Sequence, residues 1–111
     1  MRTLRICLLI LALCWVANPA VIHTLTITGN NTAQTVSTTV TSGASWVQFV
    51  APAGNSGTSR VGDTTVTSTV GIPLAPGAGM MLPYVGLGAY SLSSLKAYVA
   101  TGDTMSVTWA F

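Results

Sequence analysis

Hydrophobic and polar residues alternate at both ends of residues 21–111. One face of Val21–Thr28 is formed by Val21, His23, Leu25 and Ile27, and the opposite face is mainly threonine. One face of Thr104–Phe111 is formed by Met105, Val107, Trp109 and Phe111. A period of two is typical of a strand with one buried side. Both segments are therefore predicted to be half-buried strands of an antiparallel sheet.

Shorter runs between these two segments predict six more strands. They are expected at residues 34–41, 45–51, 58–62, 64–70, 79–85 and 92–100. Pro73, Pro76 and Pro83 indicate that the middle of the chain lies at sheet edges or in connections. Eight short strands at a spacing of roughly ten residues favour an all-β fold, a small antiparallel β-sandwich or jelly roll. Residues 21–111 are expected to form this one domain.

Glycine, asparagine and aspartate residues mark the predicted turns between the strands. The turn-forming positions are expected to be Asn55, Gly57, Gly62, Asp63, Gly71, Gly77, Gly102 and Asp103. Gly62-Asp63-Thr64 resembles Gly102-Asp103-Thr104, which could reflect two hairpins with the same turn. Two matches do not establish a repeat.

Residues 1–20 differ in composition from the rest of the chain. Arg2 and Arg5 precede an uninterrupted apolar run, Ile6–Ala17, and Asn18-Pro19 ends it. This order is typical of a secretory signal peptide. Twelve residues of helix cover only about 18 Å, too short for a hydrocarbon core of about 30 Å. Three alternatives stay open: a retained membrane or shell anchor, lipidation at Cys14 in an imperfect lipobox, and a true start near Val21.

Charge is scarce along the whole chain. Charged residues make up 5% of the sequence, against roughly 25% in an average soluble protein. After residue 20 the charged side chains are Arg60, Lys96, Asp63 and Asp103. Too few cations are present to neutralise several phosphates, so nucleic acid is not an expected partner. Both cysteines, Cys7 and Cys14, precede residue 21, so no disulfide is expected within the domain.

The residue types that support catalysis or metal binding are also scarce. His23 is the one histidine, and zinc sites need three or four ligands, so a packing role is expected for it. Asp63 and Asp103 are too few for a calcium site and are expected in turns and caps. The serine and threonine hydroxyls have no evident activating base. We predict no catalytic residue, cofactor or metal, and thus no enzyme.

Aromatic residues are assigned to two groups. The first is expected to fill the core and consists of Trp46, Phe49, Trp109 and Phe111. The second is expected to be partly exposed and consists of Tyr84, Tyr90 and Tyr98. Exposed aromatic rings beside hydroxyl groups can stack on sugar rings, so these tyrosines are the candidate surface contacts for a glycan.

Turn and strand residues from Gly54 to Phe111 follow a distinctive order. It comprises the Asn55-Ser56-Gly57 turn, a strand ending at Val70-Gly71, a Gly-x-x-Leu-x-x-Gly connection from Gly71 to Gly77, and a late strand before Gly102-Asp103. This order resembles small β-sandwich modules of tailed-phage virion proteins, which occur as capsid decorations, fibres or tail attachments. The resemblance implies a structural role in a virion and no catalytic residues.

Low charge also bears on assembly. Soluble β-proteins protect their sheet edges with lysine, proline or bulges. With one lysine and one arginine after residue 20, the edges are expected to be covered in a homo-oligomer or against a capsid or appendage protein. The leading hypothesis is a non-enzymatic virion protein that decorates a phage capsid or appendage. The alternative is a secreted or envelope-attached binding module, with carbohydrate as its ligand.

Overall fold

The computed structural model describes residues 21–39 and 43–111, and these residues form strands and connections without a helix. The segment 1–20, with its predicted signal or anchor, lies outside the described residues. The strands are β1 (Ile22–Thr28), β2 (Ala33–Thr35), β3 (Trp46–Val50), β4 (Ser59–Gly62), β5 (Ile72–Leu74), β6 (Gly79–Leu82), β7 (Lys96–Tyr98) and β8 (Thr104–Ala110). The prediction of an all-β fold with eight strands is confirmed.

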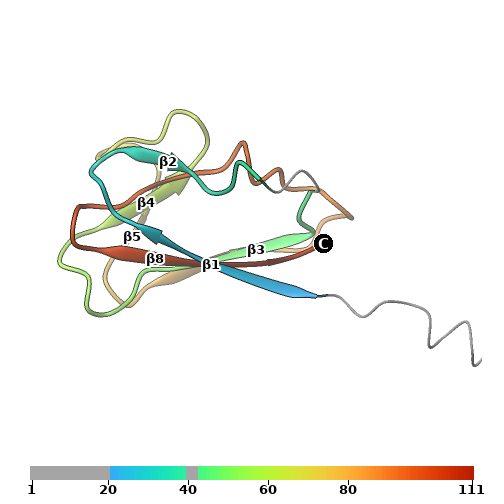
Figure 1. The fold of residues 1–111 in the computed structure, drawn as a ribbon, viewed down its shortest axis with the longest axis horizontal. Coiled ribbons are helices and arrows are strands. Elements are labelled where there is room, and N and C mark those ends of the chain that lie inside the picture. Colours follow the sequence, from blue (N-terminus) through green and yellow to red (C-terminus); the bar gives the residue numbers. More distant parts are fainter. Residues whose placement is uncertain (1–20, 40–42) are drawn as a thin grey trace, which may run out of the picture.

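The eight strands form two antiparallel sheets that face each other (Figure 1). One sheet has the order β1-β8-β3-β6 and the other the order β2-β7-β4-β5. The first strand, β1, therefore pairs with the last strand, β8. The other pairs are nested inside this one: β2 with β7, β3 with β6, and β4 with β5. One long antiparallel hairpin wound around itself gives this order, with successive pairs placed in alternate sheets. This is the jelly-roll form of a β-sandwich.

The core lies between the inner faces of the two sheets. Phe49, Met105 and Val107 from the first sheet are fully buried, as is Ala97 from the second. Along β8 the burial alternates as predicted, with Met105, Val107 and Trp109 inside and Ser106 outside. In β1, Leu25 and Ile27 face inward, so the period-two pattern placed the correct face of both terminal strands in the core.

Pro73 lies where the sequence placed it, at an edge. It is the middle residue of β5, the edge strand of the second sheet, where it pairs with Arg60 of β4. Proline cannot donate a backbone hydrogen bond, so an edge is where a sheet tolerates it.

The prediction of a strand at residues 64–70 was wrong, because this segment forms successive turns and bends. The Asp63 carboxylate accepts hydrogen bonds from the backbone N–H and the hydroxyl of Thr65, at 2.8 and 2.6 Å. The Thr67 hydroxyl accepts from the N–H groups of Thr69 and Val70. Such local side-chain contacts compete with strand pairing. The strand instead forms at β5, which the sequence did not predict.

Two glycines occupy turns that require a positive φ. Gly77 has φ 85° in the turn that Pro76 begins, closed by a bond of 2.9 Å from Ala78 N–H to the Ala75 carbonyl. Gly102 has φ 92° in the turn closed by Asp103 N–H and the Ala100 carbonyl. Both are type II turns, in which glycine is favoured at the third position.

Candidate functional site

The three tyrosines named from the sequence do not form one platform. Tyr84 follows β6 and is 61% exposed. Tyr90 is partly buried against the core, and its hydroxyl donates to the Pro83 carbonyl at 2.6 Å. Tyr98 lies on β7 in the other sheet, where it pairs with Arg60 and Ala33. The structure therefore does not bring the three tyrosines together on one surface.

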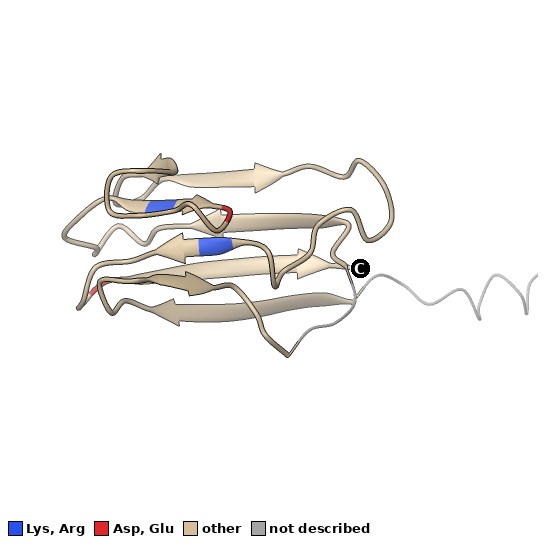
Figure 2. Cartoon of the chain, turned by 90° about the horizontal axis from the view of Figure 1, so that it is seen from above, with Lys and Arg blue, Asp and Glu red and all other residues tan. Residues whose placement is uncertain are grey.

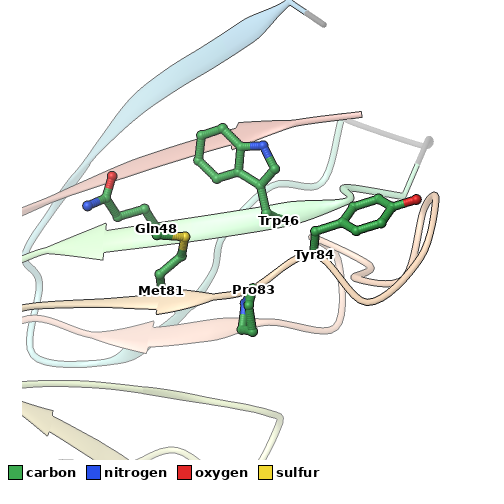
Figure 3. A pocket seen from close by; sticks show the side chains of 5 residues that line it. All are labelled: Trp46, Gln48, Met81, Pro83 and Tyr84. Carbon is green, nitrogen blue, oxygen red and sulfur yellow. The ribbon is translucent and has the colours of Figure 1, made fainter.

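A shallow groove instead lies on the outer face of the β1-β8-β3-β6 sheet. It has a volume of about 370 Å³ and is lined by Trp46, Gln48, Met81, Pro83 and Tyr84. Figure 3 shows Trp46 and Gln48 projecting from β3, with Met81 on the adjacent β6. We call these five residues the aromatic groove. It combines two aromatic rings with one side-chain amide.

Strand parity explains why the sequence prediction missed this groove. Val47 and Phe49 point inward and are completely buried, so Trp46 and Gln48 must point outward. The expectation that Trp46 fills the core was wrong. Counting positions from Phe49 would have placed Trp46 on the outer face, because successive strand residues alternate.

The expectation that Phe111 fills the core was also wrong, because Phe111 lies just beyond β8 and is 42% exposed. Its ring and that of His23 form a T-shaped pair, with 5.1 Å between ring centroids. His23 also stacks on Trp109 at 5.6 Å, its cross-strand neighbour in β8. His23 thus packs between two aromatic rings at one end of the sandwich. Within the described residues, no group of His, Cys, Asp or Glu could hold a metal ion.

Asp103 and Asn55, two of the predicted turn residues, meet across the fold. The Asp103 carboxylate accepts hydrogen bonds from the N–H groups of Ser56 and Gly57, at 2.8 and 3.0 Å, and from the Ser56 hydroxyl. The Asn55 amide exchanges two bonds with the backbone of Thr104, at 2.7 and 3.0 Å. We call this arrangement the Asn55–Asp103 clamp. It fixes the Asn-x-Gly turn to the start of β8.

These bonds lower the pKa of Asp103 from its ordinary value of 3.8. The N–H of Ser56 is the largest cause, and burial of the carboxyl acts in the opposite direction. The pKa of Asp63 is also lowered, first by the hydroxyl of Thr65 and then by its N–H. The two Gly-Asp sequences therefore form different structures: Asp63 closes a local turn, and Asp103 holds a segment distant in sequence.

The remaining turn residues have separate places in the fold. Gly71 has φ 123° just before β5, whereas Gly62 is the last residue of β4. Neither contributes to the aromatic groove.

The two sheets differ in their content of charged residues. Arg60 lies on β4 and Lys96 on β7, both in the second sheet, while β1, β8, β3 and β6 contain no Asp, Glu, Lys or Arg. Figure 2 shows the charged positions between the middle of the molecule and the end away from the C-terminus. The outer face of the first sheet is formed mainly by threonine, serine and the groove residues, together with Ile22 and Val50.

Comparisons with protein-family models, curated proteins and solved structures gave no match. In the part of the chain described here, no helix has the length and apolar character needed to cross a membrane.

Proposed function

We propose that this chain is a non-enzymatic structural protein of a virion, which decorates a phage capsid or appendage through its β1-β8-β3-β6 sheet. The observation that carries the proposal is the unprotected edge of this sheet at β1. A structural role requires a large docking surface and no reactive group. The jelly roll is used by viral capsid domains, although the same fold serves lectins and enzymes.

The four described edge strands differ in their protection. β5 contains Pro73, β6 is followed by Pro83, and β2 has only three residues. In contrast, β1 has seven residues, pairs along its whole length with β8, and contains no proline or charged residue. A long uncharged edge is a template for pairing with another strand. Pairing there would extend the sheet into a neighbouring subunit or the particle surface.

The resemblance to phage modules supports the same conclusion from the turn residues. Three positions of that pattern take part in the clamp: Gly57 donates to Asp103, and Asn55 bonds to the backbone of Thr104, the residue after Asp103. Their hydrogen bonds give a structural reason for the pattern, because the Asn-x-Gly turn is bound to the strand that follows Gly102-Asp103.

Mass spectrometry of purified particles from the source tests the virion role. We expect peptides from residues 21–111 in particles, at a constant ratio to the major shell protein. Recovery of the chain only from the secreted or envelope fraction, starting near Val21, would contradict a virion role.

A charge placed on β1 tests the docking edge. Thr26 is an exposed residue of β1, so Thr26→Lys is expected to weaken particle binding and self-association by about tenfold or more, because lysine protects a strand edge. Thr64→Lys is the matched control, since Thr64 is exposed outside the strands. Equal binding by the two variants, measured by sedimentation, would exclude the β1 edge as the docking site.

The aromatic groove supports a second candidate, a carbohydrate-binding module. Trp46 and Tyr84 provide rings for stacking, and the Gln48 amide can donate to and accept from sugar hydroxyls. Glycan-array binding that is lost in Trp46→Ala and kept in Tyr98→Ala would favour this function. An array without any bound glycan would remove it.

A further inference from the structure

Exposed apolar side chains gather at one end of the sandwich. Large hydrophobic residues that are at least 42% exposed number nine among those described, and six of them lie at this end. They are Val21, Ile22, Tyr84, Val85, Leu87 and Phe111, which we call the apolar tip.

Strand register places these six residues together. Ile22 pairs with Ala110, and Ala110 pairs with Trp46, so the start of β1, the end of β8 and the start of β3 share one end. β6 ends at Leu82, opposite Val47, so the segment that follows it emerges at the same end. A bridge between Ala44 and Tyr90 returns that segment to the sandwich. Residues 83–89 therefore form a loop at the end where the chain enters β1 and leaves β8 (Figure 1).

The loop presents its apolar side chains outward. Tyr84, Val85 and Leu87 are 61%, 70% and 83% exposed. Two glycines flank Leu87, and Gly88 has φ 66°. The Tyr90 hydroxyl holds the base of the loop through the Pro83 carbonyl. The side chains thus project from the loop, which suits insertion into a soft apolar layer better than packing against a flat protein surface.

We propose that the apolar tip inserts into the interface of a lipid bilayer. Among the described residues, the charged positions lie away from this end (Figure 2), so none of these charges has to leave water when the tip enters the bilayer. Tyrosine is favoured at the membrane–water interface, where its ring is apolar and its hydroxyl stays hydrated. The proposal is independent of the virion role.

The sequence that leads into Val21 supports a lipid partner. In the alternative in which residues 1–20 are retained as an anchor, the apolar run Ile6–Ala17 precedes the tip by only a few residues, and a run of this length suits an interfacial segment rather than a span. Single weak membrane signals bind only marginally, and stable attachment takes two. The tip supplies the second apolar contact at the end of the domain where the first would be tethered.

A fluorescent label at the tip tests the proposal in the full chain. We would replace Cys7 and Cys14 with serine, introduce Leu87→Cys, and attach an environment-sensitive fluorophore. Upon addition of phosphatidylcholine vesicles, we expect a blue shift and a several-fold rise in emission, with quenching by brominated lipid. Ile72→Cys is the control, since Ile72 is 49% exposed on β5 in the other sheet, and its label should stay in water.

Other outcomes of this experiment overturn the proposal. A chain that does not float with vesicles, or that floats with the label at residue 87 still in water, would exclude tip insertion. A blue shift that appears with rising protein concentration and without lipid would indicate a second copy as the partner.

A pair of double variants supplies an independent measurement. Val85→Ser with Leu87→Ser should lower vesicle binding by about tenfold, because two exposed apolar side chains are lost. Val70→Ser with Ile72→Ser changes residues of similar exposure, 48% and 49%, outside the tip, and should leave binding unchanged. Equal binding by both double variants would contradict a role of the loop.

Discussion

The Asp103 carboxylate is buried, yet its pKa is lowered, because N–H donors from Ser56 and Gly57 favour the charged form. A carboxyl with a lowered folded-state pKa stabilises the fold fully above its unfolded value of 3.8. The contribution is lost as the pH falls below that value and passes through the folded-state pKa. The Asn55–Asp103 clamp should therefore open in acid.

Asp103→Asn tests this pH dependence. The variant should be less stable at neutral pH, and proton uptake on unfolding below pH 3.8 should fall by up to about one proton. Urea unfolding at a series of pH values measures both effects. Asp63→Asn is the comparison, since the Asp63 carboxylate accepts only from its local turn. A pH profile of Asp103→Asn identical to that of the unmodified chain would show that the clamp is not the acid-sensitive element.

Substitution of Ser59, unlike that of Asp103, is predicted not to destabilise the fold. Its hydroxyl is buried without a hydrogen-bond partner among the described residues, whereas the Ser56 hydroxyl donates to Asp103. A buried hydroxyl without a partner destabilises the fold. Ser59→Ala should thus leave the free energy of unfolding unchanged or raise it by about 1 kcal/mol, and Ser56→Ala should lower it. A clear loss of stability in Ser59→Ala would show that the hydroxyl is bonded after all.

Strand β3 shows how one element divides its residues between core and surface. Phe49 is fully buried, and Trp46, three positions earlier, lines the aromatic groove. Phe49→Ala should cost about 3–5 kcal/mol of unfolding free energy through cavity formation. Trp46→Ala should cost only about 1 kcal/mol. Chemical denaturation measures both, and equal losses would contradict the outward placement of Trp46.

The strands that sequence periodicity predicted well are those that pair in long ladders. β1 and β8 pair over seven residues, and their inward-facing residues recur at every second position. Residues 64–70 are rich in threonine and valine, which favour strands, yet Asp63 and Thr67 bind nearby backbone groups and hold this segment in turns. Arg60 adds bonds of 3.0 and 3.1 Å to the carbonyls of Ser68 and Gly71. Periodicity cannot reveal such competing contacts, so β5 was missed.

The aromatic groove could be predicted only in part. Tyr84 was named as a partly exposed aromatic residue, but Trp46 was placed in the core because it falls on a predicted strand of a domain without a disulfide. Met81 and Pro83 join the groove through the pairing of β6 with β3. That pairing joins segments about thirty residues apart, and nothing local in the sequence specifies it. The apolar tip depends in the same way on the register of several strands.

The jelly-roll winding explains how distant parts of the chain come together in the whole molecule. Because the first and last strands pair, the chain enters β1 and leaves β8 at the same end, beside the loop that follows β6. The opposite end holds the Asn55–Asp103 clamp at the start of β8. The fold thus separates a polar end fixed by hydrogen bonds from an apolar end proposed to enter a membrane.

The distribution of charge leads to a last prediction, on salt. Three of the four charged side chains of the described domain, Arg60, Asp63 and Asp103, bind backbone or hydroxyl groups. Contacts of this kind are screened little by salt, whereas exposed ion pairs are weakened by it. Between about 0.05 M and 1 M sodium chloride, the free energy of unfolding should change by less than about 1 kcal/mol.

The same salt series applied to particle binding separates two modes of docking. Pairing at the uncharged β1 edge should hold in 1 M salt, as should burial of the outer sheet face, because neither depends on ion pairs. Thr26→Lys provides the contrast, since its added charge should make the remaining binding depend on salt. Release of the unmodified chain by salt, with its fold intact, would place docking on Arg60 and Lys96 of the second sheet and would overturn the proposed role of β1.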